Sequence, residues 1–392
     1  MSDKRRRVNS KGEVSYQVRF IDKSKKSGFG YKSFKRAKDA DLFKAKKDLE
    51  ETQLSHSHLP KISVPEAIEK WLNICEKVGR DGREPVEQMT LVEYERRAKI
   101  MNQYAWSKPA NELSASDIVH FRSWLLENHS RDLARRTLSS FGSVLKEMAI
   151  QGYIASNPAT GISIRSDGRY ETYSAEITIP SDREVQAILE TTQALKSKSK
   201  LFEKAWRRYR PMILLIVFAG LRMSEVRGLS WSSVHRNRIE VKQRADKLGI
   251  IGPVKSRSAY RTIELSSKVT DELFEWREHC PATEYDLVFP TKTGRPIMLN
   301  NFYLDAWRPL MRYAGLMIRD ANGGDQKAAY APHALRHYYA SKLIEMGKDI
   351  KFIQTRMGHS NSQITLDVYG HLMKDREAEH QATADELASE LL

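Results

Sequence analysis

Cysteine is almost absent from this sequence, with only Cys75 and Cys280 among 392 residues. Two cysteines cannot form a disulfide framework or the cysteine-rich cluster of a structural zinc site. Asp and Glu residues are likewise not gathered into a cluster that suggests a metal ion. We therefore expect apolar cores rather than covalent or metal cross-links, and we expect neither a metal nor any other cofactor.

Long apolar stretches are also lacking. The longest, Met212–Leu221 (MILLIVFAGL), has about half of the roughly 20 residues that a bilayer-spanning helix needs, so it predicts a buried helix. The basic start MSDKRRR is not followed by an apolar segment, as a secretory signal would be. These absences argue against a membrane partner. They favour a cytoplasmic protein, which in a bacterium would have access to the nucleoid.

Positive charge is what the composition has in excess. The chain has 65 Lys and Arg against 50 Asp and Glu, which gives a formal net charge of +15 at pH 7. Such a balance favours a polyanionic partner such as nucleic acid, although a generally basic protein would have the same composition. The length predicts two or three domains, each able to bury a core.

The first 55 residues carry a disproportionate share of this charge. They contain 16 Lys and Arg against 8 Asp and Glu, so about +8 of the +15 lies here. Apolar and polar residues alternate from Val14 to Phe20, which predicts a strand, and Gly30–Phe34 predicts another. Arg36–Thr52 has helical spacing. We expect a small sheet with one helix and a basic face, rather than a solubilising basic tail.

Residues 63–162 carry the signals of a helical domain. Ser63 precedes a helix with Pro65 in its first turn, and a Ser-x-x-Asp cap begins another helix at Ser114. Basic residues are spread along these helices, and most such charges on a protein surface are simply solvated. The segment that follows, Ile164–Pro180, has the composition of a linker.

A third domain is predicted for residues 177–392. A capping box, Ser181-x-x-Glu184, begins its first helix. Two short alternating segments, Arg238–Gln243 and Tyr260–Leu265, predict a pair of strands. The chain as a whole is therefore expected to be multidomain and mainly α, with small β-sheets (α+β).

Four residues suited to phosphodiester chemistry fall close together in the C-terminal part, namely His333, Arg336, His359 and Tyr369. Arg holds the charge of a phosphodiester with a planar fork of donors, and imidazole exchanges a proton near neutral pH. A Tyr becomes a covalent nucleophile once its proton is removed. Taken singly, each would more often be a solvated or packing residue. Together they predict a site.

A second segment, Ala219–Trp231 (AGLRMSEVRGLSW), adds a second arginine and a carboxylate to these four residues. Arg222 follows the apolar helix and supplies a second guanidinium. Glu225 comes one helical turn later, where it can orient that guanidinium.

These motifs resemble the tyrosine recombinase (lambda-type phage integrase) family. Gly-Leu-Arg-x-x-Glu is followed by His-x-Leu-Arg-His, then Gly-His-Ser, then a Tyr ten residues later. The separations, 336 − 333 = 3, 359 − 336 = 23 and 369 − 359 = 10, also match the family. The sequence departs from the family at Ala219, where Thr is common, and at Ser232-Ser233, where an Asp usually follows the Trp.

The resemblance implies a role for each residue. Tyr369 would attack the scissile phosphate, forming a 3′-phosphotyrosyl bond and releasing a 5′-hydroxyl. Arg222 and Arg336 would clamp the non-bridging oxygens, with a hydrogen bond from His359. His333 would act as the base toward the tyrosine.

The family also carries a catalytic Lys on a hairpin, which corresponds to Lys255 here and would protonate the departing 5′-oxygen. Lys247 and Lys242 are rivals for this position. Because the phosphotyrosine keeps the energy of the phosphodiester, religation needs no ATP. Attack by the 5′-hydroxyl of a partner strand would give strand exchange.

The resemblance implies three modules and several partners. Residues 1–55 resemble the arm-type DNA-binding domain, a three-stranded sheet plus helix; residues 63–162 resemble the core-binding helical domain; and residues 177–392 resemble the catalytic domain. The implied partners are double-stranded DNA at core and arm sites, further copies in a homotetramer on synapsed DNA, an accessory DNA-bending protein and an excisionase. Integration or excision of a mobile element would be the outcome.

Two other functions are alternatives to a recombinase: a type IB topoisomerase-like enzyme and a catalytically inactive DNA-binding protein.

The last segment, Lys374–Leu392, has a narrow apolar stripe on an acidic background. Ala384, Leu387, Ala388 and Leu391 recur at helical spacing. A helix this short is marginal alone in water, so we expect it to dock, either on its own domain or on a neighbouring subunit.

Overall fold

The structure is a computed structural model that describes residues 3–8, 14–22, 25, 27–56, 60–165, 178–320, 323–373 and 388–390. The chain forms two compact units, Met1–Asp167 and Gly168–Leu392. Most of the predicted linker, residues 166–177, and nearly all of the predicted docking segment Lys374–Leu392 lie outside the described residues. The prediction for that segment therefore stays a prediction. Within the described ranges, no helix has the length and apolarity that a membrane span requires.

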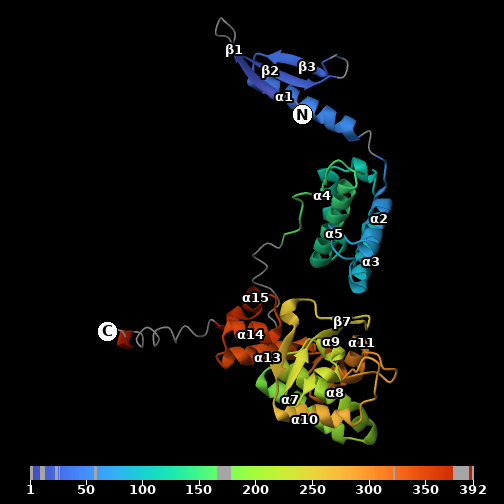
Figure 1. Cartoon of the computed structure of the whole chain (residues 1–392), viewed down its shortest axis with the longest axis vertical. Coiled ribbons are helices and arrows are strands. Elements are labelled where there is room, and N and C mark those ends of the chain that lie inside the picture. Colours follow the sequence, from blue (N-terminus) through green and yellow to red (C-terminus); the bar gives the residue numbers. More distant parts are fainter. Residues whose placement is uncertain are drawn as a thin grey trace. The chain divides into compact units, whose positions relative to one another are not determined.

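The N-terminal part contains the predicted sheet and helix (Figure 1). Strands β1 (Asp3–Val8), β2 (Val14–Ile21) and β3 (Phe29–Phe34) are antiparallel in the order β1-β2-β3, and helix α1 (Ala37–His56) follows. Val18 on β2 and Ala40 on α1 are fully buried between them. The three-stranded sheet expected from the family is thus confirmed.

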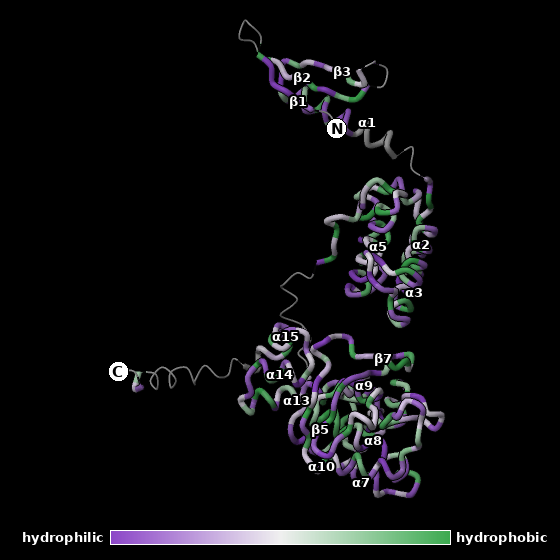
Figure 2. Tube along the Cα trace, in the orientation of Figure 1, coloured by the Kyte–Doolittle hydropathy of each residue, from purple (hydrophilic) through white to green (hydrophobic). Residues whose placement is uncertain are grey.

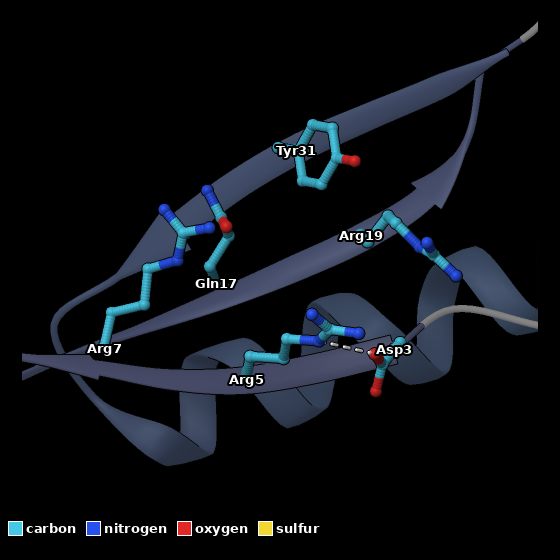
Figure 3. Close-up of a pocket in the computed structure, with 6 residues that line it drawn as sticks. All are labelled: Asp3, Arg5, Arg7, Gln17, Arg19 and Tyr31. Carbon is cyan, nitrogen blue, oxygen red and sulfur yellow. Dashed lines mark hydrogen bonds and ion pairs between the residues drawn. The ribbon is translucent and has the colours of Figure 1, made fainter. Parts of the chain in front are cut away.

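The two faces of this sheet differ in chemistry. The cleft on one face is lined by Asp3, Arg5, Arg7, Gln17, Arg19 and Tyr31, which all have odd numbers (Figure 3). Alternate residues of a strand point to opposite faces, so even-numbered residues face α1. Lys4 accordingly pairs with Asp41 of α1. Figure 2 colours β1 largely as hydrophilic. The face away from the helix therefore presents basic and aromatic side chains.

The rest of the first unit is a helical bundle. Its helices are α2 (Val64–Lys77), α3 (Gln88–Gln103), α4 (Ala115–Asn128) and α5 (Arg131–Ile150). The core includes Trp71, Phe121 and Phe141, which are all fully buried. Capping boxes begin α2 at Ser63 and α4 at Ser114, as the sequence predicts.

The second unit is mixed. Its long central helix α8 (Lys200–Ala219) contains the apolar run and lies against α7 (Asp182–Ser197), α10 (Ser267–Arg277) and α13 (His333–Glu345). Strands β4 (Val234–His235), β5 (Arg238–Val241) and β8 (Arg261–Glu264) form one antiparallel sheet, which confirms the predicted pairing of β5 with β8. Smaller hairpins pair β6 (Gln243–Ala245) with β7 (Ile251–Pro253), and β9 (Met317–Arg319) with β10 (Asp325–Ala328).

The remaining helices complete this unit. They are α9 (Met223–Gly228), α11 (Leu299–Phe302), α12 (Arg308–Tyr313), α14 (Ile350–Met357) and α15 (Ser362–Met373). Helices α13, α14 and α15 contact one another. The mainly α, multidomain architecture with small sheets agrees with the expected fold class.

Gly220 ends α8 in the left-handed conformation, with φ 59°. A Cβ at this position would overlap the ring of Tyr339 on α13. Gly220→Ala should therefore lower the free energy of unfolding of the second unit by about 2–4 kcal/mol, from backbone strain and ring displacement together. Calorimetry of the full chain measures this change. Gly315→Ala is the matched control, because Gly315 is also left-handed (φ 74°) but has open space around the added Cβ. Equal losses in the two variants would refute the packing argument.

Candidate active site

Two helix ends create a set of carbonyl acceptors in the second unit. Helices α8 and α14 both terminate at left-handed glycines, Gly220 (φ 59°) and Gly358 (φ 61°). Carbonyls in the last turn of a helix have no partner within it and take external donors. The Arg336 guanidinium donates to the Gly220 and Met357 carbonyls, and Arg222 Nη2 donates to the Gly358 carbonyl at 3.2 Å. The fold thus brings two predicted arginines to one place.

Glu225 is the carboxylate that pairs with Arg222 and Arg261. Its Oε1 accepts from Arg222 Nη1 at 2.8 Å, and its Oε2 accepts from the Arg222 backbone N–H at 2.9 Å and from Arg261 Nη2 at 2.8 Å. The residue is only 3% exposed. Burial alone would raise its pKa, but the hydrogen bond and charge of Arg261, together with Arg222 and Arg336, lower the pKa of Glu225 to about 2. The carboxylate is therefore ionised at any physiological pH.

Arg261 is a buried site residue that the sequence reasoning missed. It begins β8, where its alternation with apolar residues predicts only a strand position. Its Nε also donates to the Arg356 carbonyl at 2.8 Å, next to the end of α14. Arg261 thereby links Glu225 to the turn that precedes His359.

His359 is buried and bonded at both ring nitrogens. Nε2 lies 3.3 Å from Arg336 Nη2, and Nδ1 lies 2.9 Å from the Thr365 hydroxyl on α15. Since a guanidinium can only donate, Nε2 must accept, and Nδ1 then carries the hydrogen. Burial, followed by the charges of Arg336 and Arg222, lowers the pKa of His359 to about 3. The imidazole is neutral near pH 7.

Tyr369 lies on α15 and is 1% exposed. Its phenol oxygen forms a 2.7 Å hydrogen bond with Nδ1 of His337 on α13. Burial raises the pKa of Tyr369 to about 12, although Arg336 and Arg222 act in the opposite direction. His337 was not among the predicted site residues. The signal for it was present, because it is the second histidine of His-x-Leu-Arg-His and lies one helical turn from His333.

The two other predicted residues are exposed. His333 is the first residue of α13, and its ring packs edge-to-face on His337 at 4.7 Å between centroids. Lys255 lies on the loop between β7 and the short helix Arg257–Ala259. That loop returns to the site, because a Cβ added to Gly358 would lie 3.3 Å from the Cα atom of Ala259.

The rivals of Lys255 have different surroundings. Lys242 forms an ion pair with Glu240 on β5, and Lys247 is exposed in the turn that joins β6 to β7. The loop of Lys255 runs beside the end of α14, and the assignment of Lys255 as the catalytic lysine stays a prediction.

Comparisons with known proteins show the family to which the chain is similar. Residues 181–376 match the phage integrase family. A tyrosine recombinase XerC-like protein of Caldanaerobacter subterraneus subsp. tengcongensis is 25% identical over 83% of both chains. Tyrosine recombinase XerC of Proteus mirabilis is 26% identical over 79% of this chain and 92% of its own length.

Solved structures with the same fold include two integrases. The Tn1549 transposon integrase in complex with transposon right end DNA has a TM-score of 0.63 at 19% identity, covering 82% of this chain and 100% of that one. A lambda integrase dimer bound to a COC′ core site has a TM-score of 0.51 at 16% identity, covering 79% of this chain and 96% of that one.

The low pKa of His359 predicts acid sensitivity. In the unfolded chain a histidine titrates near pH 6.5, whereas the folded His359 binds a proton only near pH 3. Between these values the unfolded state holds more protons, so the free energy of unfolding falls as the pH falls. The loss from this residue should reach about 2 kcal/mol at pH 5. His359→Gln should remove that part of the difference in unfolding free energy between pH 7 and pH 5.

Chemical unfolding of the full chain at both pH values measures this difference. His279→Gln is the control, because His279 lies exposed just beyond α10. An unchanged pH dependence in His359→Gln would contradict the burial argument.

Proposed function

The chain belongs to the phage integrase family and is a tyrosine-type site-specific DNA recombinase, and we propose that it cuts and rejoins DNA through a 3′-phosphotyrosyl intermediate to integrate or excise a mobile element. The observation that carries this proposal is the buried phenol of Tyr369 within electrostatic reach of both Arg336 and Arg222. A nucleophile beside two guanidiniums suits attack on a phosphodiester. Chemistry of this kind would take place in the bacterial cytoplasm.

The proposed cleavage step is a transesterification. The Tyr369 oxygen forms a bond to phosphorus, the bond from phosphorus to the 5′-oxygen breaks, and the phosphate stays on the 3′-end. Arg222 and Arg336 stabilise the charge that grows on the non-bridging oxygens. His359 adds a hydrogen bond when its hydrogen moves to Nε2, and Nδ1 then accepts from the Thr365 hydroxyl. Lys255 protonates the departing 5′-oxygen. Religation reverses these steps with the same groups, and a 5′-hydroxyl from a partner strand completes the exchange.

The tyrosine proton needs an acceptor during attack. With the pKa of Tyr369 at about 12, forming the phenolate at pH 7 spans 12 − 7 = 5 pH units, or about 7 kcal/mol. Removing the proton as the bond to phosphorus forms avoids this full cost. The sequence predicts His333 as the acceptor, and the hydrogen bond between the Tyr369 phenol and Nδ1 of His337 indicates a second candidate.

We assign the other modules by the same resemblance. Residues 63–162 would hold core-site DNA, residues 177–392 would do the chemistry, and residues 1–55 would bind separate arm sites. A lambda integrase tetramer bound to a Holliday junction supports the proposal of a homotetramer on synapsed DNA. An accessory DNA-bending protein and an excisionase are further partners that the family resemblance implies. A type IB topoisomerase-like activity would use the same groups but would not join strands from two duplexes, so a two-duplex assay separates it from the proposed function.

Tyr369→Phe removes the attacking oxygen and keeps the packing of the ring. We expect DNA binding within about twofold of wild type and no covalent adduct, because no other atom can form the ester. A nicked suicide substrate followed by denaturing electrophoresis detects the adduct. Tyr339→Phe on α13 is the control and should still form it. A persistent adduct in Tyr369→Phe would sink the assignment of the nucleophile and the function built on it.

The basic face of the N-terminal sheet should bind arm DNA. Arg7→Ala should weaken binding to DNA that flanks the cut site by about tenfold, since one side chain that reads a base edge contributes about 1–3 kcal/mol. Arg6→Ala is the matched control, because it removes the same charge from the opposite face of the same strand. Electrophoretic mobility shifts of the full chain, with flanked and unflanked duplexes, measure the difference. Equal losses in the two variants would show that charge alone, and not this face, binds DNA.

A further inference from the structure

We propose that His337 is a catalytic residue that accepts the proton of Tyr369 as cleavage proceeds and returns it during religation. This inference rests on the proposed function of the site. The general-base role then belongs to His337, whereas the sequence motifs predict His333 for it.

The hydrogen bond is the first support. Nδ1 of His337 lies 2.7 Å from the Tyr369 oxygen, a distance at which a proton passes directly between heavy atoms. The two residues belong to α13 and α15, which pack together, so their separation is fixed by the fold. Tyr369 is 1% exposed, and solvent is therefore poorly placed to take the proton. A buried nucleophile needs a base within the protein.

The direction of the hydrogen bond suits this role. His337 is half-buried, and burial together with the charge of Arg336 lowers its pKa, so it rests as neutral imidazole. In the tautomer that carries hydrogen on Nε2, Nδ1 accepts the phenol O–H. The lone pairs of the phenol oxygen then remain available for phosphorus.

His333 is less well placed for the same task. Burial, followed by the charges of His337 and Arg336, lowers the pKa of His333 to about 4, so it also rests as a neutral imidazole despite the surface exposure of the residue. Its ring lies against the edge of His337, whereas His337 forms the hydrogen bond to the phenol. The charged and titratable groups around His337 are therefore His333 and Arg336 on its own helix and Tyr369 on α15. Arg222 adds positive charge at the site. His333 is thus expected to affect the nucleophile through His337.

The charge balance explains why the base works only with substrate present. Protonated His337 beside Arg336 is unfavourable in the free protein. Once a phosphodiester is clamped, its negative charge offsets that of the guanidiniums, and an imidazolium becomes easier to form.

In the cleavage step itself, the proton moves from the Tyr369 oxygen to Nδ1 of His337 while the bond to phosphorus forms. The 5′-oxygen leaves with a proton from Lys255, so atoms and charges balance.

Single-turnover cleavage of a suicide substrate by the full chain tests the inference. His337→Ala and His337→Asn should both cleave about 100-fold or more slowly than wild type, with DNA binding within about twofold. Asn is the informative variant, because its side-chain oxygen can still accept the phenol hydrogen bond but cannot take the proton. In both variants the rate should rise about tenfold per pH unit above pH 7, because the fraction of Tyr369 that is already ionised rises tenfold per pH unit below its pKa of about 12.

A second measurement separates a base from a merely positioning residue. Tyr369 is replaced by a fluorinated tyrosine whose phenol ionises near neutral pH, in wild type and in His337→Ala. A nucleophile that is already ionised needs no base, so the two proteins should then cleave within about tenfold of each other. Wild-type rates in His337→Asn would overturn the proposal, and so would a slow His337→Ala that fluorination does not rescue. Absence of any adduct in wild type would instead refute the proposed function itself.

Discussion

The buried carboxylate of Glu225 is the constraint on which the rest of the site depends. It lies between the guanidiniums of Arg222 and Arg261, at 2.8 Å from each. Without it, three guanidiniums would be crowded together with no counter-charge, because Arg336 is buried in the same site. A charge left unpaired in such a place is strongly destabilising. Glu225 also accepts a hydrogen bond from the backbone N–H of Arg222. It therefore fixes both the start of α9 and the direction of the Arg222 side chain, which precedes that helix.

The two glycine-terminated helices complete that constraint. Their terminal carbonyls accept hydrogen bonds from Arg222 and Arg336. A guanidinium has five N–H donors, so in the proposed clamp the remaining N–H groups would bind the phosphate. Carbonyls carry no net charge, so they orient the arginines and reduce the attraction of the arginines for a phosphate less than a carboxylate would. The left-handed conformation at Gly220 and Gly358 is therefore tied to the site as well as to the helix ends. For the proposed phosphate clamp, this arrangement would pre-organise the two arginines, as electrostatic catalysis requires.

Sequence reasoning was strongest where the information is local. The capping box at Ser181, the pairing of β5 with β8, and strands β2 and β3 of the N-terminal sheet all follow from spacing within short segments, and the structure contains them. Strand β1 was expected only from the family resemblance. Sequence reasoning failed where a contact joins distant segments. Arg261 looked like an ordinary strand residue because its partner Glu225 lies 36 positions away. His337 was in a motif already noted, but its partner Tyr369 lies 32 positions further on, and only the packing of α13 on α15 brings them together. The roles of the individual site residues remain predictions.

The resting electrostatics of the site make its chemistry dependent on DNA. Three guanidiniums face one carboxylate. Burial keeps Tyr369 protonated against these positive charges, with a pKa of about 12, whereas burial and the same charges together keep His359 neutral, with a pKa of about 3. The surplus positive charge has no counterpart among the described residues of the site, and a phosphodiester is the chemical group that would supply one. Entry of that group would change the balance for every titratable neighbour at once. Binding and activation of the nucleophile are therefore expected to be one electrostatic event, since the charge that the arginines recognise is the same charge that lets a histidine accept the proton of Tyr369.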